Sequence, residues 1–426
     1  MDLDDLRLAP VTVRFPRPVV SDLAAATREA VAQVLAARSL PAGAQIGVTL
    51  GSRGIANIAS IARAAIEALD EHGHKPFVIP AMGSHGGATS EGQRNLLAHY
   101  GVTEDELGVP IRDDMAARSL GTTPDGIEAF IADVAWQADG VLLLNRVKPH
   151  TDFKGPLESG LSKMCAIGLG KFEGARECHR QVFGIGLGNA IRAAAGRVIE
   201  SGKILGGVAI LENAYHETAK IEAVTLDGFF THEERLLVEA KGLMGRLPLD
   251  EIDILICDRM GKNISGAGID TNIIGRSVYG YEQGRPWQEG MPVIHRIVVR
   301  DLADESDGNA VGMGLVDFVP RRFAKKVNEE VTMLNAMTAR SPENAKWPFV
   351  LESDRDCLRM ALSAIPERPT GPVIVYVRDT LALGRAYVSE TALRLLRRRD
   401  DVVATGPAAP LGWHGDALGS PFAAVP

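Results

Sequence analysis

Short runs of aliphatic residues alternate along the chain with longer stretches in which apolar positions recur at helical spacing. The aliphatic runs predict strands over residues 45–50, 75–80, 140–145, 206–211, 252–257, 293–299 and 372–377. Between the first two runs, Ile58, Ile61, Ala65 and Leu69 fall on one face of a helix predicted over residues 55–72. The same spacing predicts helices over residues 22–36, 188–200, 232–244, 321–339 and 353–365. This alternation predicts an α/β fold with Rossmann-like parallel or mixed sheets.

The chain also divides into two predicted lobes. A helical stretch ends in the segment GLMGRLPLDEIDILICD, whose last part starts a new strand at Ile252. We therefore expect one α/β domain over residues 1–246 and a second over residues 247–426, with a cleft between them. Ligands of α/β proteins usually bind at the carboxyl ends of the strands and in such clefts. The second domain is accordingly expected to close over a ligand held by the first.

Charge and composition exclude several classes of partner. The 54 acidic residues outnumber the 46 basic ones, and the basic residues are scattered, so nucleic acid is not expected as a partner. No stretch approaches the roughly 18 apolar residues of a membrane span, and the N-terminus lacks a basic region before an apolar run. Four cysteines without a C-x-x-C pair fit a reducing, cytoplasmic compartment. Glycine stands out, because 45 glycines beside 5% aromatic residues are typical of tight turns around small ligands.

The glycines gather with chemically active side chains after the predicted strands. The segment TLGSRGIAN follows the first strand, and its Arg53 is suited to hold a carboxylate or phosphate, although a surface ion pair fits equally well. The segment PAMGSHGGATSEGQ follows the second strand and places His85 among small residues that leave it accessible. Thr89 or Ser90 is expected to cap the helix that comes next. His85 is therefore a candidate for chemistry.

The richest segment runs from Asn145 to Arg180. It contains His150, Lys163 and His179 among many glycines, with too few apolar positions for an ordinary packed helix. We therefore expect a functional loop here.

The second domain offers a further segment over residues 257–276. Its Asn272 and Arg276 are placed to close over an anionic ligand, although each alone also fits a turn former or a surface charge. The chain lacks H-E-x-x-H, a P-loop and G-x-G-x-x-G with an acidic residue about twenty positions on. A zinc site built from protein ligands alone and ordinary dinucleotide binding are therefore not indicated.

Taken in order, these segments resemble the nickel-pincer cofactor-dependent lactate racemase family. Family members carry a glycine–histidine turn after an early strand, here MGSHGGAT with His85. They then carry a Pro-His element and a glycine-rich stretch that ends in a lysine, here KPHTDFKGPLESGLSK with His150 and Lys163. A further histidine lies sixteen positions beyond that lysine, as His179 does. The likeness extends over most of the chain and is clearer in the first lobe.

The resemblance implies a nickel-pincer nucleotide, a pyridinium-derived mononucleotide that holds Ni(II) through two sulfurs and a ring carbon. Lys163 would anchor it covalently through a thioamide, and His179 would be the remaining nickel ligand, which suits a square-planar Ni(II) site. His85 and His150 would act as general bases on opposite sides of a 2-hydroxy acid. One of them would take the hydroxyl proton while hydride leaves the carbon, and hydride would return to the other face of the planar keto acid. Arg53, helped by Asn272 or Arg276, would hold the carboxylate.

The sequence departs from the family at its first strand end. The racemases carry Asp-x-x-Arg-Pro there, whereas Leu50 stands at the acidic position and Gly54 follows Arg53. The thirteen positions from His150 to Lys163 also exceed the family interval. We therefore expect a divergent isomerase that acts on a small anionic 2-hydroxy acid other than lactate and that receives its cofactor from cofactor-synthesis proteins.

Two alternatives use the same residues differently. A 2-hydroxy acid oxidoreductase would pass the hydride to an exchangeable cofactor, for which the dinucleotide fingerprint is missing. A non-catalytic carrier of nickel or of the cofactor would need Lys163 and His179 but not both His85 and His150.

Overall fold

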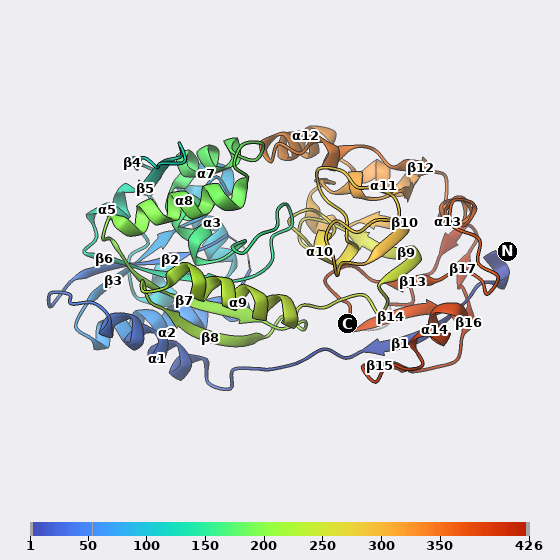
Figure 1. The fold of residues 1–426 in the computed structure, drawn as a ribbon, viewed down its shortest axis with the longest axis horizontal. Helices are drawn as coiled ribbons and strands as arrows, with labels where there is room; N and C mark the ends of the chain where they lie inside the picture. Colours follow the sequence, from blue (N-terminus) through green and yellow to red (C-terminus); the bar gives the residue numbers. More distant parts are fainter. Residues whose placement is uncertain (1–2, 53, 423–426) are drawn as a thin grey trace. The chain divides into compact units, whose positions relative to one another are not determined.

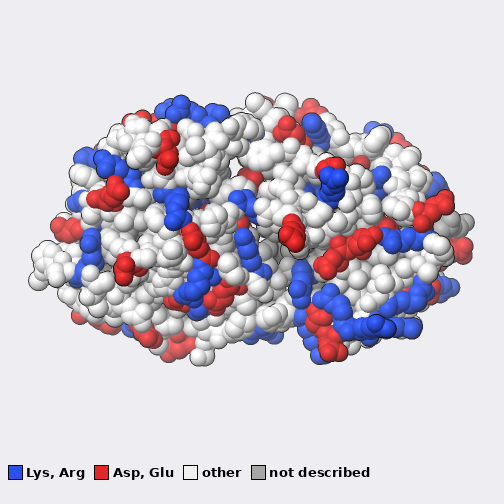
Figure 2. Space-filling model, viewed as in Figure 1, with Lys and Arg blue, Asp and Glu red and all other residues white. Residues whose placement is uncertain are grey.

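The computed structural model of the 426-residue chain describes residues 3–52 and 54–422 and has the predicted α/β fold (Figure 1). It contains two compact units. The N-terminal unit is Pro16–Met244, and the C-terminal unit combines Met1–Phe15 with Gly245–Pro426. Lysines and arginines are mixed with acidic residues over the face of both units drawn in Figure 2, as the scattered charge of the sequence predicts.

The N-terminal unit is built on a five-stranded sheet in the order β3-β2-β6-β7-β8. The parallel strands are β2 (Gln45–Leu50), β3 (Lys75–Pro80), β6 (Gly140–Arg146) and β7 (Ile204–Glu212), and β8 (Thr218–Val224) runs antiparallel at one edge. The first two strands have the predicted bounds. Their near-continuous apolar runs are those of strands buried on both faces, which is why the sequence locates them well.

Helices cover both faces of this sheet. Alternate residues of β6 show the division, because Leu142 and Leu144 pack with α1 (Leu23–Ala36) and α2 (Ile58–Glu71), whereas Val141 and Leu143 face α8 (Leu187–Glu200) and α9 (Phe229–Leu243). The remaining elements of the unit are α3 (Ser90–His99), α4 (Glu104–Leu107), the hairpin β4 (Ala117–Thr122) and β5 (Glu128–Ala132), α5 (Asp133–Gln137), α6 (Leu161–Lys163), the π-helical turn η3 (Met164–Gly168) and α7 (Lys171–Arg180).

The C-terminal unit has a mixed sheet in the order β12-β11-β10-β9-β13-β14-β1-β15. Its parallel part comprises β12 (Phe349–Leu351), β11 (Phe318–Pro320), β10 (Val293–Leu302), β9 (Glu251–Met260) and β13 (Ile374–Val377). The antiparallel part comprises β14 (Arg385–Ser389), β1 (Arg7–Val13) and β15 (Val402–Ala404). The helices are α10 (Thr271–Ile274), α11 (Arg321–Lys326), α12 (Glu329–Thr338), α13 (Asp354–Ser363) and α14 (Glu390–Leu396).

Two boundaries differ from the sequence prediction. The first residues were assigned to the first domain, but β1 pairs with β14 and β15 and so belongs to the C-terminal unit. A pairing between residues almost 380 positions apart leaves no local signal in the sequence. The single helix predicted over residues 321–339 is two helices, because the Asn328 side chain accepts from the Val331 N–H and starts α12 anew. The change of unit at Gly245 lies close to the predicted boundary.

None of the helices within residues 3–52 and 54–422 is both long and apolar enough to cross a membrane.

Candidate functional site

The candidate site lies where β2, β3 and β6 end in the N-terminal unit. Parallel strands bring their carboxyl ends to one edge of a sheet, and β2 lies between β3 and β6. His85 follows β3 and His150 follows β6, so the two histidine segments flank the end of β2. Arg53 follows β2 but lies outside the described residues, and its carboxylate contact stays a prediction.

His85 sits in a turn whose conformation requires glycine. Gly86 has a φ of +65°, and a Cβ there would lie 2.6 Å from the carbonyl carbon of Gly92. A Cβ on Gly92 would lie 1.9 Å from the Gly86 oxygen, so the turn and the start of α3 approach closely. The fully buried Gln93 donates from Nε2 to the carbonyl oxygens of Gly83 (3.0 Å) and His85 (3.3 Å). The hydrogen bonds from Gln93 therefore fix the backbone of the turn, and the His85 side chain is exposed.

Ser52 contacts the His85 ring directly. Its Oγ forms a short hydrogen bond with Nδ1 of His85, and its own carbonyl oxygen accepts from the Tyr100 hydroxyl at 3.0 Å. The second ring nitrogen, Nε2, is therefore the one presented for proton transfer. No role was predicted for Ser52, although the sequence places it between two glycines at the end of a predicted strand.

The loop that carries His150 is held by a buried carboxylate. Glu158 is 2% exposed and accepts the backbone N–H of His150 at 2.6 Å and that of Gly155 at 3.4 Å. The oxygen that accepts from Gly155, Oε1, also pairs with Lys241 of α9 at 2.7 Å. Lys154 also donates to the His150 carbonyl oxygen. The predicted functional loop is therefore well ordered around His150, and Glu158 and Lys241 are residues that the sequence analysis missed.

The His150 ring has defined partners on both nitrogens. Nδ1 accepts the backbone N–H of Asp152 at 3.0 Å, and Nε2 lies 2.6 Å from Nζ of Lys163. Burial, followed by the positive charges of Lys163, Lys148 and Lys154 and by His179, holds the pKa of His150 well below its usual value. The ring is therefore uncharged at neutral pH and able to accept a proton. The structure brings the predicted residues His150 and Lys163 together.

Lys163 lies in a helical segment, contrary to the expected loop over residues 145–180. It ends α6 and leads through the π-helical turn η3 into α7. The glycines that suggested a loop instead allow close packing between turns, because a Cβ on Gly170 would lie 2.3 Å from the Ala166 oxygen and one on Gly174 2.6 Å from it. Single π-helical turns within helices frequently mark functional sites.

The start of α6 is capped from α9. The buried Glu233 accepts the N–H of Ser162 at 2.9 Å and also its hydroxyl. A Cβ on Gly160 would lie 2.0 Å from Glu233 Oε1, so glycine is needed for this approach. Burial raises the pKa of Glu233 to about 7. A carboxyl group that titrates near neutrality therefore adjoins the residue that precedes Lys163.

His179 lies in α7 and has one ring nitrogen occupied. Its Nδ1 donates to the Ala175 carbonyl oxygen at 2.7 Å, which directs metal binding to Nε2. The described residues contain no group of three or more His, Cys, Asp or Glu placed to hold a metal. The implied nickel-pincer nucleotide brings two sulfurs and a carbon of its own, so it needs one protein ligand, and His179 fits that requirement.

The two nearby cysteines are thiols rather than thiolates. Burial raises the pKa of Cys165 well above its usual value and that of Cys178 to about 12. Sulfur ligands of a metal are thiolates. Neither thiol is therefore favoured as a metal ligand, and a cofactor source of sulfur stays a prediction.

The two predicted residues of the second domain lie in the C-terminal unit. Arg276 is 3% exposed and donates to the carbonyl oxygens of Leu315 (2.6 Å) and Ile294 (3.1 Å) and to Asp317 (2.8 Å). The amide of Asn272 donates to Asp270 at 2.9 Å, near the start of α10. The contacts of Arg276 hold the C-terminal unit together, and a substrate contact of either residue stays a prediction.

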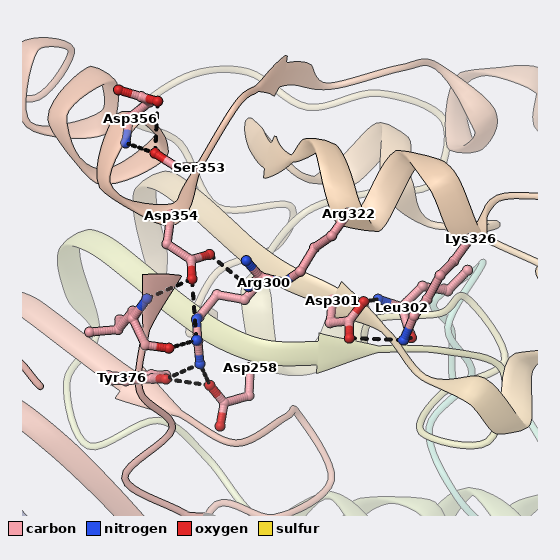
Figure 3. Close-up of polar contacts among 11 residues, drawn as sticks. Asp258, Arg300, Asp301, Leu302, Arg322, Lys326, Ser353, Asp354, Asp356 and Tyr376 are labelled. Carbon is pink, nitrogen blue, oxygen red and sulfur yellow. Dashed lines mark hydrogen bonds and ion pairs between the residues drawn. The ribbon is translucent and has the colours of Figure 1, made fainter. Parts of the chain in front are cut away.

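The strand ends of the C-terminal unit carry a buried polar network that the sequence did not reveal (Figure 3). Arg300 of β10 forms an ion pair with Asp258 of β9, donates to the Tyr376 hydroxyl of β13 at 2.6 Å and lies 3.3 Å from Asp354 of α13. It also donates to the carbonyl oxygen of Leu418. The network therefore ties the C-terminal segment to the sheet.

Comparisons with known proteins find a weak structural similarity. No family model matches the chain, and no curated protein matches it. One solved structure to which the chain is similar is the lactate racemase apoprotein from Thermoanaerobacterium thermosaccharolyticum, at 13% identity and a TM-score of 0.48. The match covers 88% of this chain and 99% of that one. Similarity at this level carries no argument about fold or activity, so the side chains described above have to support any function.

Proposed function

We propose that the protein is a racemase or epimerase of a 2-hydroxy acid and uses a nickel-pincer nucleotide. The observation that carries the proposal is the contact of Lys163 with an uncharged His150, 2.6 Å apart, in a sheet where a second histidine follows β3, two strands away from β6. The sequence resemblance assigns the anchor to Lys163 and the nickel ligand to His179. When bound, the nucleotide supplies a centre that accepts and returns hydride.

The two histidine segments follow strands whose spacing suits a small substrate. Neighbouring strands lie about 4.8 Å apart, so the ends of β3 and β6, with β2 between them, are separated by roughly 10 Å. A 2-hydroxy acid between His85 and His150 would meet one base on each side. Each enantiomer presents its hydroxyl group to a different base, which explains why both are needed. In either direction, one base takes the hydroxyl proton of the entering enantiomer, and the other base donates the proton that completes the hydroxyl group of the product enantiomer.

The rest of the chain supplies binding and orientation in this proposal. Arg53 would hold the substrate carboxylate, and Ser52 and Glu158 would fix the His85 ring and the His150 backbone. Leu50 is fully buried where the family has an acid, which supports a substrate other than lactate. The cofactor would come from cofactor-synthesis proteins in the cytoplasm.

The proposal is tested by expressing the protein with a cofactor-synthesis system and following the optical purity of single-enantiomer 2-hydroxy acids and aldonic acids. Conversion of either enantiomer to the same mixture is the expected result. Loss of optical purity in none of them would contradict the proposal, and accumulation of the keto acid would favour the oxidoreductase.

A matched pair of histidines tests the metal ligand. His179 in α7 and His72, directly after α2, both donate from Nδ1 to the carbonyl oxygen four residues earlier at 2.7 Å. We expect His179→Gln to lose bound nickel and His72→Gln to retain it. Equal nickel content in the two variants would remove His179 from the assignment.

A further inference from the structure

We propose that two copies of this chain associate through α12 of the C-terminal unit, with the two helices antiparallel across a twofold axis. The inference rests on the exposed face of α12 and on the charges at its two ends. It is independent of the site in the N-terminal unit and of the proposed function, so either can fail without the other.

The exposed face of α12 carries the larger apolar side chains of the helix. Leu334 is 69% exposed, Met337 62% and Met333 56%. The buried face carries Thr332 and Ala336, each 1% exposed. A helix that only covers a core has the opposite arrangement, because its large apolar residues are the ones that it buries. The distribution in α12 is therefore that of a helix with a second surface to cover.

These side chains form one continuous patch. Residues three and four apart are neighbours on a helix, so Met337 adjoins both Met333 and Leu334. Val331, which is 39% exposed, adjoins Leu334 in the same way. Contiguous apolar patches mark interaction surfaces, whereas single exposed apolar residues do not. Methionine suits such a surface because its flexible side chain adapts to the opposite face.

The ends of α12 carry opposite charges. Glu329 and Glu330 are exposed in the first turn, and Arg340 is exposed just after the last one. A second α12 laid antiparallel brings the acidic end of each copy to the basic end of the other. The centre of this ten-residue helix lies between Met333 and Leu334, so a twofold axis there makes every contact twice and closes the assembly. This self-complementarity selects a second copy of the chain as the partner.

The backbone at Arg340 favours a different residue. Arg340 has a φ of +55°, its N–H donates to the Met337 carbonyl oxygen at 3.0 Å, and the Ser341 N–H donates to that of Ala336 at 3.0 Å. Glycine usually occupies this position of a helix end, because an L side chain is strained at positive φ. Arginine provides a positive charge that glycine lacks, at the point where the glutamates of the second copy would lie.

The experiment is sedimentation equilibrium of the full-length protein from about 1 µM to about 200 µM. We expect a concentration-dependent dimer, because two short helices bury less surface than a standard interface and therefore associate weakly. Leu334→Lys should raise the dissociation constant of the dimer roughly 10- to 100-fold, since each substitution enters the interface twice. Leu395→Lys, at a leucine of α14 that is 57% exposed, is the matched control and should leave the dissociation constant unchanged.

A charge exchange tests the antiparallel arrangement. Glu330→Arg and Arg340→Glu should each raise the dissociation constant roughly 3- to 10-fold, because like charges then meet at both ends, and the two substitutions together should restore it. Arg340→Gly should weaken the dimer without lowering the midpoint of thermal unfolding, because glycine relieves the strain at positive φ.

A wild-type protein that stays monomeric over this range would overturn the inference, and so would a dimer that Leu334→Lys leaves intact. A dimer in which the double exchange does not restore the wild-type dissociation constant would contradict the antiparallel pairing.

Discussion

In both units parallel strands bring charged and polar side chains to their carboxyl ends, but the two units use them differently. In the C-terminal unit, the guanidinium group of Arg300 bonds to Asp258, Tyr376, Asp354 and a backbone oxygen. In the N-terminal unit, the bonds around His85 and His150 fix the turn and loop backbones and leave ring nitrogens facing a hydroxyl or an amine. Polar residues after a strand therefore do not by themselves indicate a site. The strand ends of the two units differ in whether the polar side-chain atoms already bond to other parts of the fold.

The largest effect should come from replacing either base of the N-terminal unit. We expect His85→Gln or His150→Gln to lower the isomerisation rate by about 10²- to 10⁴-fold, which is the usual contribution of a general base. Chiral chromatography of the product measures the rate, and nickel content measures loading of the cofactor.

Retained nickel with lost isomerisation would support catalysis by both histidines. Unchanged biological activity in both variants would favour the carrier instead.

Substitutions in the polar network of the C-terminal unit should lower the free energy of unfolding. Arg300→Met leaves the Asp258 carboxylate without its ion-pair partner and removes one of the two arginines beside the fully buried Asp354, which should cost about 3–5 kcal/mol of unfolding free energy. Arg322→Met removes a half-exposed partner of the same Asp354 and should cost less than about 1 kcal/mol. Urea unfolding measures both. Equal losses in the two variants would mean that the network is not the buried ion cluster described here.

Glu233 should make the stability of the N-terminal unit depend on pH. Burial raises the pKa of its carboxyl from 4.5 to about 7, so the stabilisation belongs to the protonated form and is lost as pH rises through 7. Glu233→Gln removes this titration, so its stability relative to wild type should increase by roughly 3 kcal/mol between pH 4 and pH 8.

Glu29→Gln, at an exposed acid of α1 in the same unit, is the control and should keep the pH dependence of the wild type. Parallel stability curves for Glu233→Gln and wild type would show that the carboxyl does not titrate in this range.

The smallest effect is expected at Ser52. Ser52→Ala removes the hydroxyl that orients the His85 ring and should lower the isomerisation rate by roughly 3- to 10-fold, in keeping with one hydrogen bond of about 1 kcal/mol. Because His85 would still be present, the pH profile of the rate should shift while KM changes little. An unchanged rate and pH profile would show that Ser52 does not orient the base.

The sequence predicted the strands of the sheets better than it predicted the contacts that these elements make. The bounds of β2 and β3 were correct because a continuous apolar run identifies a strand buried on both faces. The helices around Lys163 were missed because glycines that allow close packing look like loop residues in the sequence.

The residues close in sequence to the site did not indicate which side chains support it. Glu233 lies 71 positions from the Ser162 that it caps, and Lys241 lies still farther from the Glu158 that it pairs with. Such contacts depend on how α9 packs on the sheet, which spacing along the chain does not encode. His85 and His150 were singled out because each follows a predicted strand, and Lys163 and His179 because they match a family motif.

The most direct test of the account is the intact mass and nickel content of the protein after expression with a cofactor-synthesis system. We predict a mass adduct that maps to Lys163, about one nickel per chain, and loss of both in Lys163→Ala. Lys75→Ala, at an exposed lysine of the same unit, should keep the adduct and the metal. An unmodified, metal-free wild-type protein under these conditions would contradict the account.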